Sequence, residues 1–351
     1  MDRIPVAILG ATGTVGQRFV QLLADHPWFE MTALVASDRS AGQPYAAACH
    51  WLLPTPIPDA VRDLVVAPLG RALDCPLIFS ALPSAVAGPA EERYAQAGHV
   101  VCSNAAAHRL DADAPLLIPE VNPGHTALIH TQRRRRGWEG CIVTSANCST
   151  TQLALALKPL HDAFGLRQVS VVTLQAISGA GYPGVPALDI LGNVIPFIGG
   201  EEDKVEREPL KLLGALQGER VIDAPFAISA QCNRVPVRDG HTECVSVEFE
   251  SGVQIDEVIA ALEGFRASPE IANLPSSPAR PIVVRREPNR PQPALDRDAG
   301  KGMSITVGRV RPCPVADVKF VVLGHNTLRG AAGGSIHNAE LLAAQGWITP
   351  P

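Results

Sequence analysis

A glycine-rich turn near the start of the chain restricts the possible folds more than any other feature. The apolar run IPVAILG leads into GATGTVG, and the following residues, TVGQRFVQLLADHP, have apolar positions at helical spacing. Gly10, Gly13 and Gly16 let a backbone approach a pyrophosphate at a helix N-terminus, where free N–H groups and the helix dipole favour anions. The alternative is a tight turn that binds nothing. The order of strand, turn and helix favours a dinucleotide-binding domain.

The alternation of strands and helices continues to about residue 150. The runs MTALVAS, PLIFSAL and HVVCSN are typical of buried strands, and GPAEERYAQAG between the last two is typical of a helix. Strands that alternate with helices form a parallel sheet covered on both faces. We therefore expect an α/β chain with a Rossmann-type domain over residues 1–150.

The second part of the chain has a different pattern. Residues 165–175, 226–238 and 242–250 are typical of longer strands, and RDGH between the last two predicts a hairpin over 226–250. Residues 275–300 are rich in Pro and Arg and predict a long loop, whereas GGSIHNAELLAAQGW predicts a helix. We expect an α+β catalytic and dimerisation domain with a mixed sheet over 151–330, and a C-terminal helix within 331–351 that joins the first domain.

Composition excludes several classes of function. A length of 351 residues allows about two domains, and a net charge of -5 gives no overall attraction to nucleic acid or an anionic membrane. The basic run at 133–136 is expected on a solvated surface, and the uncharged stretch 140–157 is too polar for a membrane span. The eight cysteines show neither a Cys-x-x-Cys pair nor a metal-binding spacing with His, and the first residues resemble no secretory signal. We expect reduced thiols, a cytoplasmic protein and no metal.

The end of the second predicted strand bears on the choice of cofactor. An acidic residue there would hydrogen-bond a ribose 2′-hydroxyl and favour NAD. The sequence has ASDRS, in which Ser37, Arg39 and Ser40 suit a 2′-phosphate while Asp38 favours NAD. On balance these residues predict NADP.

One cysteine lies where a strand meets a helix, in IVTSANCSTTQLALALKPL at residues 142–160. At a helix start the dipole favours a thiolate at Cys148 and lowers its pKa, and Asn147 and the run 149–151 can cap the helix. A thiolate beside a nicotinamide adds to an aldehyde, and loss of hydride then leaves a thioester. The alternative is that Cys148 is a small core residue without a chemical role. We expect the other seven cysteines to be such core residues.

Further candidates lie downstream. His241 follows RDG, and Arg234 lies on the other arm of the predicted hairpin, so pairing of the arms would bring both to one mouth. A lone histidine in a turn is otherwise simply exposed. In EEDKVEREPLKLLG the pairs Glu208/Lys211 and 201/204 have the same spacing of three on a helix face. The sequence alone does not rank these two pairs.

Several segments together carry a family pattern. These are GATGTVGQRFVQLL, SNAAAHR, PLLIPEVNP, NCST, QAISGAGYPGVPALDILGNVIPFIGGEEDK, RVPVRDGH and HNTLRGAAGGSI. In this order, over nearly the whole chain, they resemble aspartate-semialdehyde dehydrogenase in the form found in archaea, fungi and some bacteria. The resemblance implies a reversible, phosphate-dependent, NADP-linked conversion of aspartate 4-semialdehyde to 4-phosphoaspartate. In cells it implies the reduction, at a branch point toward lysine, threonine and methionine, by a homodimer or a dimer of dimers.

The resemblance also assigns roles to individual residues. It makes Cys148 the nucleophile, His241 the acid/base catalyst and Gln175 the residue that orients the substrate and the thioester. The implied substrate ligands are Arg234 for the α-carboxylate, Glu208 for the amino group, Lys211 and Arg109 for phosphate, and Asn147 in the same anion pocket. The implied cofactor ligands are Gly10, Thr12, Gly13, Thr14, Val15, Gly16, Ser37, Arg39, Ser40, Ser178, Gly179, Ala180, Gly181 and Asn326.

Two other functions compete with this interpretation. A reductase of acyl-CoA thioesters or of N-acetylglutamyl phosphate on the same scaffold would keep Cys148 and His241 but lose the amino-acid clamp. A catalytically inactive regulator would have lost the thiol or the base. The sequence retains the thiol, the base and the candidate clamp residues.

Overall fold

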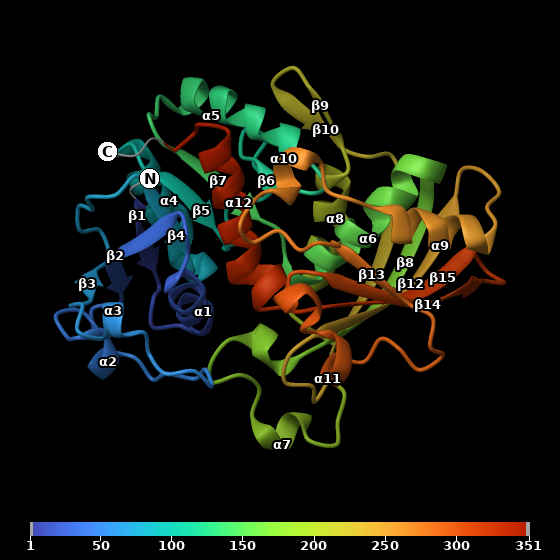
Figure 1. Ribbon diagram of the computed structural model, residues 1–351, viewed down its shortest axis with the longest axis horizontal. Coiled ribbons are helices and arrows are strands. Elements are labelled where there is room, and N and C mark those ends of the chain that lie inside the picture. The colour runs from blue at the N-terminus through green and yellow to red at the C-terminus, as the bar shows by residue number, and fades with distance from the viewer. Residues whose placement is uncertain (1–2, 349–351) are drawn as a thin grey trace.

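The first half of the chain forms a parallel sheet, as the alternation of strands and helices predicted. The computed structural model describes residues 3–348. The sheet has seven strands in the order β3-β2-β1-β4-β5-β7-β6, all paired in parallel (Figure 1). Their bounds are β1 Ile4–Leu9, β2 Phe29–Ala36, β3 Ala67–Pro68, β4 Leu77–Ser80, β5 Val100–Ser103, β6 Leu116–Leu117 and β7 Cys141–Ser145. The connecting helices are α1 Thr14–Leu23, α2 Tyr45–Ala48, α3 Asp59–Arg62, α4 Ser84–Gln96, η1 Pro123–Ala127 and α5 Leu128–Arg136.

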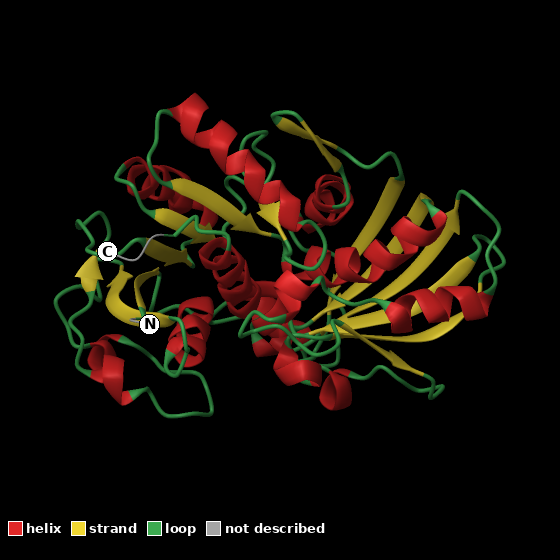
Figure 2. Ribbon diagram, turned by 45° about the horizontal axis from the view of Figure 1, so that its top comes forward, coloured by secondary structure: helices red, strands yellow, loops and turns green. Residues whose placement is uncertain are grey.

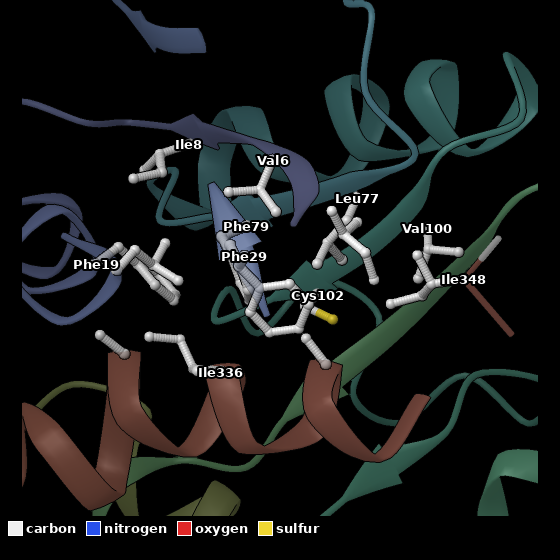
Figure 3. Close-up of a cluster of buried hydrophobic side chains, with 14 of the residues drawn as sticks. Val6, Ile8, Phe19, Phe29, Leu77, Phe79, Val100, Cys102, Ile336 and Ile348 are labelled. Atoms are coloured by element: carbon white, nitrogen blue, oxygen red, sulfur yellow. The ribbon is translucent and has the colours of Figure 1, made fainter. Parts of the chain in front are cut away.

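Each face of this sheet has its own core. Val6 and Ile8 of β1 belong to a cluster with residues of α1 and of the C-terminal helix α12 (Gly333–Ala344), whereas Ala7 and Leu9 face α4. Figure 3 shows Ile336 of α12 beneath the strands that carry Phe79 and Cys102. Burying apolar side chains on both faces stabilises a parallel sheet. Helix α12 therefore packs against the first sheet although it follows the second in sequence.

The second half contains a mixed sheet of six strands in the order β11-β8-β12-β15-β14-β13. Helices α6, α8 and α9 pack against it, and their apolar residues share a second core with the strands (Figure 2). The bounds are α6 Cys148–Phe164, β8 Leu166–Gln175, α8 Glu201–Leu212, β11 Ala227–Arg234, β12 His241–Phe249, α9 Ile255–Gly264, β13 Ile282–Arg285, β14 Ile305–Pro312 and β15 Val318–Gly324. The smaller elements are η2 Ile177–Ala180, α7 Ala187–Ile190, β9 Ala215–Gln217, β10 Arg220–Ile222, α10 Pro269–Ala272, α11 Pro293–Asp296, η3 Ala299–Gly302 and η4 Leu328–Ala332. The expected α/β fold with two sheets is confirmed.

The predicted hairpin over 226–250 is wrong. Strands β11 and β12 do not pair with each other, because β8 lies between them, parallel to β11 and antiparallel to β12. The register places Arg234 opposite Gln175, and Thr242 opposite Leu174. His241 directly precedes Thr242. It therefore lies at the same end of the sheet as Arg234, with the end of β8 between the two residues.

The basic run of α5 lies mostly on the surface, as expected, but its charges are paired. Arg134 and Arg135 are exposed and contact Glu219 in the turn between β9 and β10. Arg136 is partly buried and binds Asp113 at 2.7 Å. Among the described residues, no helix has the length and apolar character needed to cross a membrane.

Candidate active site

The cysteine singled out by the sequence lies at the first position of helix α6. Its neighbour Asn147 is the N-cap, with a side-chain oxygen that accepts hydrogen bonds from the backbone N–H groups of Ser149 at 2.9 Å and Thr150 at 3.2 Å. This capping satisfies donors that a helix start leaves free. The local sequence Asn-Cys-Ser-Thr thus fixes the thiol of Cys148 at the N-terminus of α6, as predicted.

Cys148 and His241 form a contact pair. The Sγ atom of Cys148 lies 3.3 Å from Nε2 of His241, which is fully buried at the start of β12. The other ring nitrogen, Nδ1, accepts the backbone N–H of Ala176 at 2.9 Å. Because a backbone N–H can only donate, Nδ1 is the acceptor, and the neutral ring carries its proton on Nε2. His241 therefore presents an N–H to the sulfur.

The charge state of the pair corrects the sequence prediction. Burial raises the pKa of the Cys148 thiol to about 12, and Glu201 adds to the rise, whereas Arg109 and Arg234 act against it. Burial also lowers the pKa of His241 to about 3, helped by the positive charge of Arg234. The prediction that the helix end lowers the thiol pKa is therefore wrong, because desolvation outweighs the helix N-terminus here.

Arg234 is the last residue of β11 and lies opposite Gln175, the last residue of β8. Arg234 is 6% exposed, and its Nη1 donates to the carbonyl oxygen of Ala176 at 2.8 Å. Gln175 is 1% exposed beside it, with its amide 3.3 Å from the Thr173 hydroxyl. A Cβ at Gly179 would lie 2.8 Å from Arg234 Nη1, so a larger residue there would displace the guanidinium.

Glu201 is the acidic residue whose charge acts on the pKa of the Cys148 thiol. It begins α8, is 5% exposed, and accepts a hydrogen bond from the Asn147 side-chain amide at 2.8 Å. Lys204, one turn later and about a third exposed, contacts its carboxylate at 3.1 Å. A hydrogen bond from Gln175 is among the causes that lower the Glu201 pKa. Glu201 and Lys204 thus join the group around Cys148.

The roles expected of Glu208 and Lys211 do not fit the structure. Glu208 is 1% exposed, and its two oxygens accept hydrogen bonds from Arg109 Nη1 at 2.9 Å and from the backbone N–H of Asn147 at 2.6 Å. Lys211 donates to three backbone carbonyls, those of Arg109, Asp111 and Ala114, each at 2.8 Å. An ammonium has three N–H donors, so none remains for phosphate. Both pairs have the same spacing of three. Because Glu208 and Lys211 are paired within the protein, Glu201 and Lys204 are the better candidates for contact with substrate and phosphate.

Arg109, by contrast, keeps donors for an anion. Its Nη2 donates to the Asn104 carbonyl oxygen at 2.8 Å and its Nη1 to Glu208, while its buried Nε–H has no hydrogen-bond partner within residues 3–348. A buried donor without a partner is costly, and a bound anion would satisfy it. The positive charge of Arg109 also acts against the rise of the Cys148 pKa, so Arg109 stays a candidate anion ligand.

The residues expected to hold NADP form a cradle that fits a pyrophosphate. The turn from β1 into α1 contains Gly10, Thr12 and Gly13, and the first turn of α1 contains Thr14, Val15 and Gly16. Gly10 has a φ of 74°, and a Cβ on Gly16 would lie 2.2 Å from the Gly10 oxygen, so no side chain fits at these two positions. The first-turn N–H groups of α1 have no partner within the helix and suit an anion.

A second expected cofactor segment, Ser178, Gly179, Ala180 and Gly181, lies in and just after η2. Thr14, Ser178 and Gly181 line one cavity of about 360 Å³. Asn326, after β15, donates to the Ser178 hydroxyl at 2.8 Å. Ser37, Arg39 and Ser40 do not line this cavity and lie in the turn after β2, largely exposed. The structure therefore divides the expected cofactor residues between the cavity and the end of β2.

Sequence reasoning missed several residues of this region. Arg18 lines the same cavity as Thr14. The two residues are four apart in α1 and so lie on one helix face, which the sequence spacing could have indicated. Gln152 holds β12 through its amide, which donates to the His241 carbonyl at 3.0 Å and to Glu243 at 2.8 Å. Gly330 of η4 lies directly behind Cys148, and only the three-dimensional packing reveals it.

Comparison with known proteins agrees with this geometry. Residues 5–129 match the model of the semialdehyde dehydrogenase NAD binding domain, and residues 157–329 match that of the semialdehyde dehydrogenase dimerisation domain. The aspartate-semialdehyde dehydrogenase of Archaeoglobus fulgidus is 54% identical over 97% of this chain and 98% of its own length. That of Cryptococcus neoformans is 50% identical, with coverage of 99% and 98%.

Solved structures give the same result. The aspartate-semialdehyde dehydrogenase of Candida albicans, solved with NADP, superposes with a TM-score of 0.91 at 41% identity and covers 99% of this chain and 100% of its own. Aspartate-semialdehyde dehydrogenase II of Vibrio cholerae superposes with a TM-score of 0.77 at 28% identity, with coverage of 97% and 99%. The resemblance found in the sequence is confirmed, and the chain belongs to the aspartate-semialdehyde dehydrogenase family.

Proposed function

We propose that the protein is an NADP-dependent, phosphorylating aspartate-semialdehyde dehydrogenase. The observation that carries this proposal is the Cys148–His241 contact of 3.3 Å at the start of α6, next to a carboxylate and two arginines. A nucleophile, a hydrogen-bond donor and charges for an amino acid and an anion suit acyl transfer from a small charged aldehyde. The sequence relatives carry the same name over nearly their whole length.

The chemistry begins at Cys148, which reacts as the thiolate. Its proton passes first to solvent water, because Nε2 of His241 already carries a proton, and the positive charges of Arg109 and Arg234 favour that loss. The sulfur then forms a bond to the aldehyde carbon, and the carbonyl electrons move to the oxygen. His241, protonated on Nε2, donates a hydrogen bond to this oxyanion while its Nδ1 stays fixed by Ala176. The pair thus stabilises negative charge without a full proton transfer.

NADP, bound in the cradle of Gly10 to Gly16 and beside Ser178, would supply the hydride acceptor that turns the adduct into a thioester. Phosphate then attacks the thioester carbon, and Cys148 leaves as a thiolate. We assign the phosphate to Arg109 and Lys204, because within residues 3–348 the Arg109 Nε–H has no partner and the Lys204 ammonium pairs only with Glu201. The Candida albicans relative was solved with NADP, which supports the choice of cofactor.

The amino-acid part of the substrate is recognised by opposite charges. Arg234 offers a forked guanidinium to the α-carboxylate, and Glu201 offers a carboxylate to the ammonium group. Gln175 lies between the two and orients the reacting group. Asn147 holds Glu201 through its side-chain amide. This assignment replaces Glu208 and Lys211 with Glu201 and Lys204, which lie seven residues earlier on α8.

One assay tests the proposal. NADPH formation from aspartate 4-semialdehyde is followed by absorbance, with and without inorganic phosphate, and the reverse reaction is run from 4-phosphoaspartate. We expect steady turnover only with phosphate, and a clear preference for NADP over NAD. Turnover that ignores phosphate, or reduction of acyl-CoA thioesters instead, contradicts the substrate assignment even if Cys148 is the nucleophile.

We also infer a homodimer through the mixed sheet, or a tetramer built from two such dimers. Serines 170, 229 and 246 line a hollow on the face of this sheet opposite its helices. The segment around α7 stands away from both sheets in Figure 1 and exposes Leu188, Leu191 and Phe197 at 95%, 68% and 71%. A cluster of exposed apolar side chains suits a protein interface. Light scattering is expected to give a dimer or tetramer mass, and a monomer would contradict this inference.

The domain division and the location of the protein remain proposals as well. We divide the chain into residues 1–150 with 331–351, which bind NADP, and residues 151–330, which carry the catalytic strands. Residues 1–2 and 349–351 of these ranges lie outside the described part. All eight cysteines are free, which is consistent with a reducing cytoplasm.

A further inference from the structure

Helix α8 carries two buried charges that the chemistry above does not use. Glu208 and Lys211 lie two turns after the Glu201/Lys204 pair, on the same face, and are 1% and 6% exposed. Burying a charge is costly unless its polar atoms are paired. Both side chains are fully paired, and their partners belong to the active site. Their contacts therefore indicate what the two charges do.

Glu208 joins two parts of the site that come from different places in the sequence. One oxygen accepts from Arg109 Nη1 at 2.9 Å, and the other accepts from the backbone N–H of Asn147 at 2.6 Å. Arg109 is the anion-binding arginine, and Asn147 is the N-cap that precedes Cys148. A single carboxylate thus sets the distance between the anion pocket and the nucleophile.

Lys211 holds the same arginine from its backbone. The three carbonyl groups that accept its ammonium protons belong to Arg109, Asp111 and Ala114, and all three distances are 2.8 Å. The loop over 109–114 is thereby tied to α8 at three points. Arg109 is held twice, at its guanidinium by Glu208 and at its carbonyl by Lys211. Its buried Nε–H stays without a protein partner in the described chain.

We propose that Glu208 and Lys211 are positioning residues that hold Arg109 and the Asn147–Cys148 turn at a fixed separation. This inference rests on the proposed function, because it assigns the phosphate to Arg109. Neither residue touches substrate or phosphate, yet both determine phosphate use through Arg109. The effect of Lys211 is expected to vanish when the arginine side chain is absent, and the effect of Glu208 is expected to shrink to the part that acts through Asn147. A direct phosphate ligand would instead act independently of the arginine.

A double-mutant cycle separates the two cases. We expect Lys211→Met and Glu208→Gln each to lower kcat/KM for phosphate by about tenfold to a hundredfold, because a shift near 1 Å has that effect. In an Arg109→Ala background, Lys211→Met is expected to alter kcat/KM for phosphate by less than about twofold, and Glu208→Gln is expected to alter it by clearly less than in the wild-type background. A further loss of the original size in that background would show direct phosphate contact and overturn the proposal.

The rates with two aldehyde substrates give a second measurement. It requires only Glu208→Gln, so it can be made even if Lys211→Met does not fold. Glu208→Gln is expected to slow aspartate 4-semialdehyde and 4-oxobutanoate, which lacks the amino group, by the same factor. Glu201→Gln is expected to slow the former by a clearly larger factor than the latter. If Glu208→Gln spares 4-oxobutanoate, Glu208 binds the amino group and the proposal fails.

Controls distinguish positioning from general destabilisation and from failure of the proposed function. Lys158→Met removes an exposed ion pair with Asp162 on α6 and is expected to leave all kinetic constants unchanged. Variants that lose thermal stability but keep wild-type kcat/KM for phosphate would make Glu208 and Lys211 purely structural and overturn the inference. A wild-type enzyme without phosphate-dependent turnover would instead contradict the proposed function itself.

Discussion

Replacing Gly330 with alanine tests how closely the nucleophile must be held. A Cβ added at residue 330 would lie 2.8 Å from Cβ and 2.9 Å from Cα of Cys148. Ordinary contacts begin near 3.4 Å, so one of the two segments must move by about 0.6 Å. The η4 segment cannot easily retreat, because Arg329, beside Gly330, is buried and binds Glu120 at 2.8 and 2.5 Å. The displacement therefore falls mainly on Cys148.

This displacement predicts both the size and the kind of the effect. A shift approaching 1 Å at a reacting group costs up to about a hundredfold in rate, and overpacking costs about 1–3 kcal/mol of unfolding free energy. We expect Gly330→Ala to lower kcat by about tenfold to a hundredfold while NADP affinity, measured by fluorescence titration, stays unchanged. Gly264→Ala is the matched control, because a Cβ there meets nothing within 4 Å. Wild-type kcat in Gly330→Ala would refute the reasoning.

Three further predictions concern the cofactor, the substrate carboxylate and the buried histidines. Arg39→Ala should raise KM for NADP and leave KM for NAD nearly unchanged, and equal effects on both cofactors would show another role for the arginine. Arg234→Leu should raise KM for the semialdehyde by about a hundredfold, because a charge-assisted pair worth about 3 kcal/mol is lost, and an unchanged KM would exclude the carboxylate clamp. Burial lowers the pKa of His125, His241 and His325 to about 4, 3 and 4 from 6.5. The unfolded chain then binds more protons below pH 6.5, so the unfolding free energy should fall between about pH 6.5 and 4. Urea midpoints measured across that range, if constant, would contradict it.

Local sequence patterns predicted the parts of the site that depend on neighbouring residues. The turn at Gly10 to Gly16 and the capped helix start at Cys148 were both recognisable, because backbone geometry and capping are set within a few residues. The strand order in the second sheet was not predictable in this way. The turn between β11 and β12 resembles a hairpin turn, but β8, some fifty residues earlier, pairs with both strands.

Two other features depend on burial, which spacing does not encode. Glu201/Lys204 and Glu208/Lys211 have the same spacing on one helix face, and only the packing of Asn147 and Arg109 against α8 separates their roles. The thiol pKa depends on how far Cys148 is removed from water, and this effect exceeds that of the helix end. Strands β14 and β15 have no counterpart among the predicted elements, and the prediction of a long loop over 275–300 is wrong in part, because β13 and α11 lie within it.

The central claim, that Cys148 carries the substrate as a thioester, can be measured directly. The enzyme is mixed with aspartate 4-semialdehyde and NADP in the absence of phosphate, and NADPH formation and protein mass are followed together. We expect a burst of one NADPH for each active site, an acyl adduct that maps to the Cys148 peptide, and release of that adduct when phosphate is added. Cys148→Ser should show neither burst nor adduct. An adduct on another residue, or full turnover in the serine variant, would show that Cys148 does not carry the thioester.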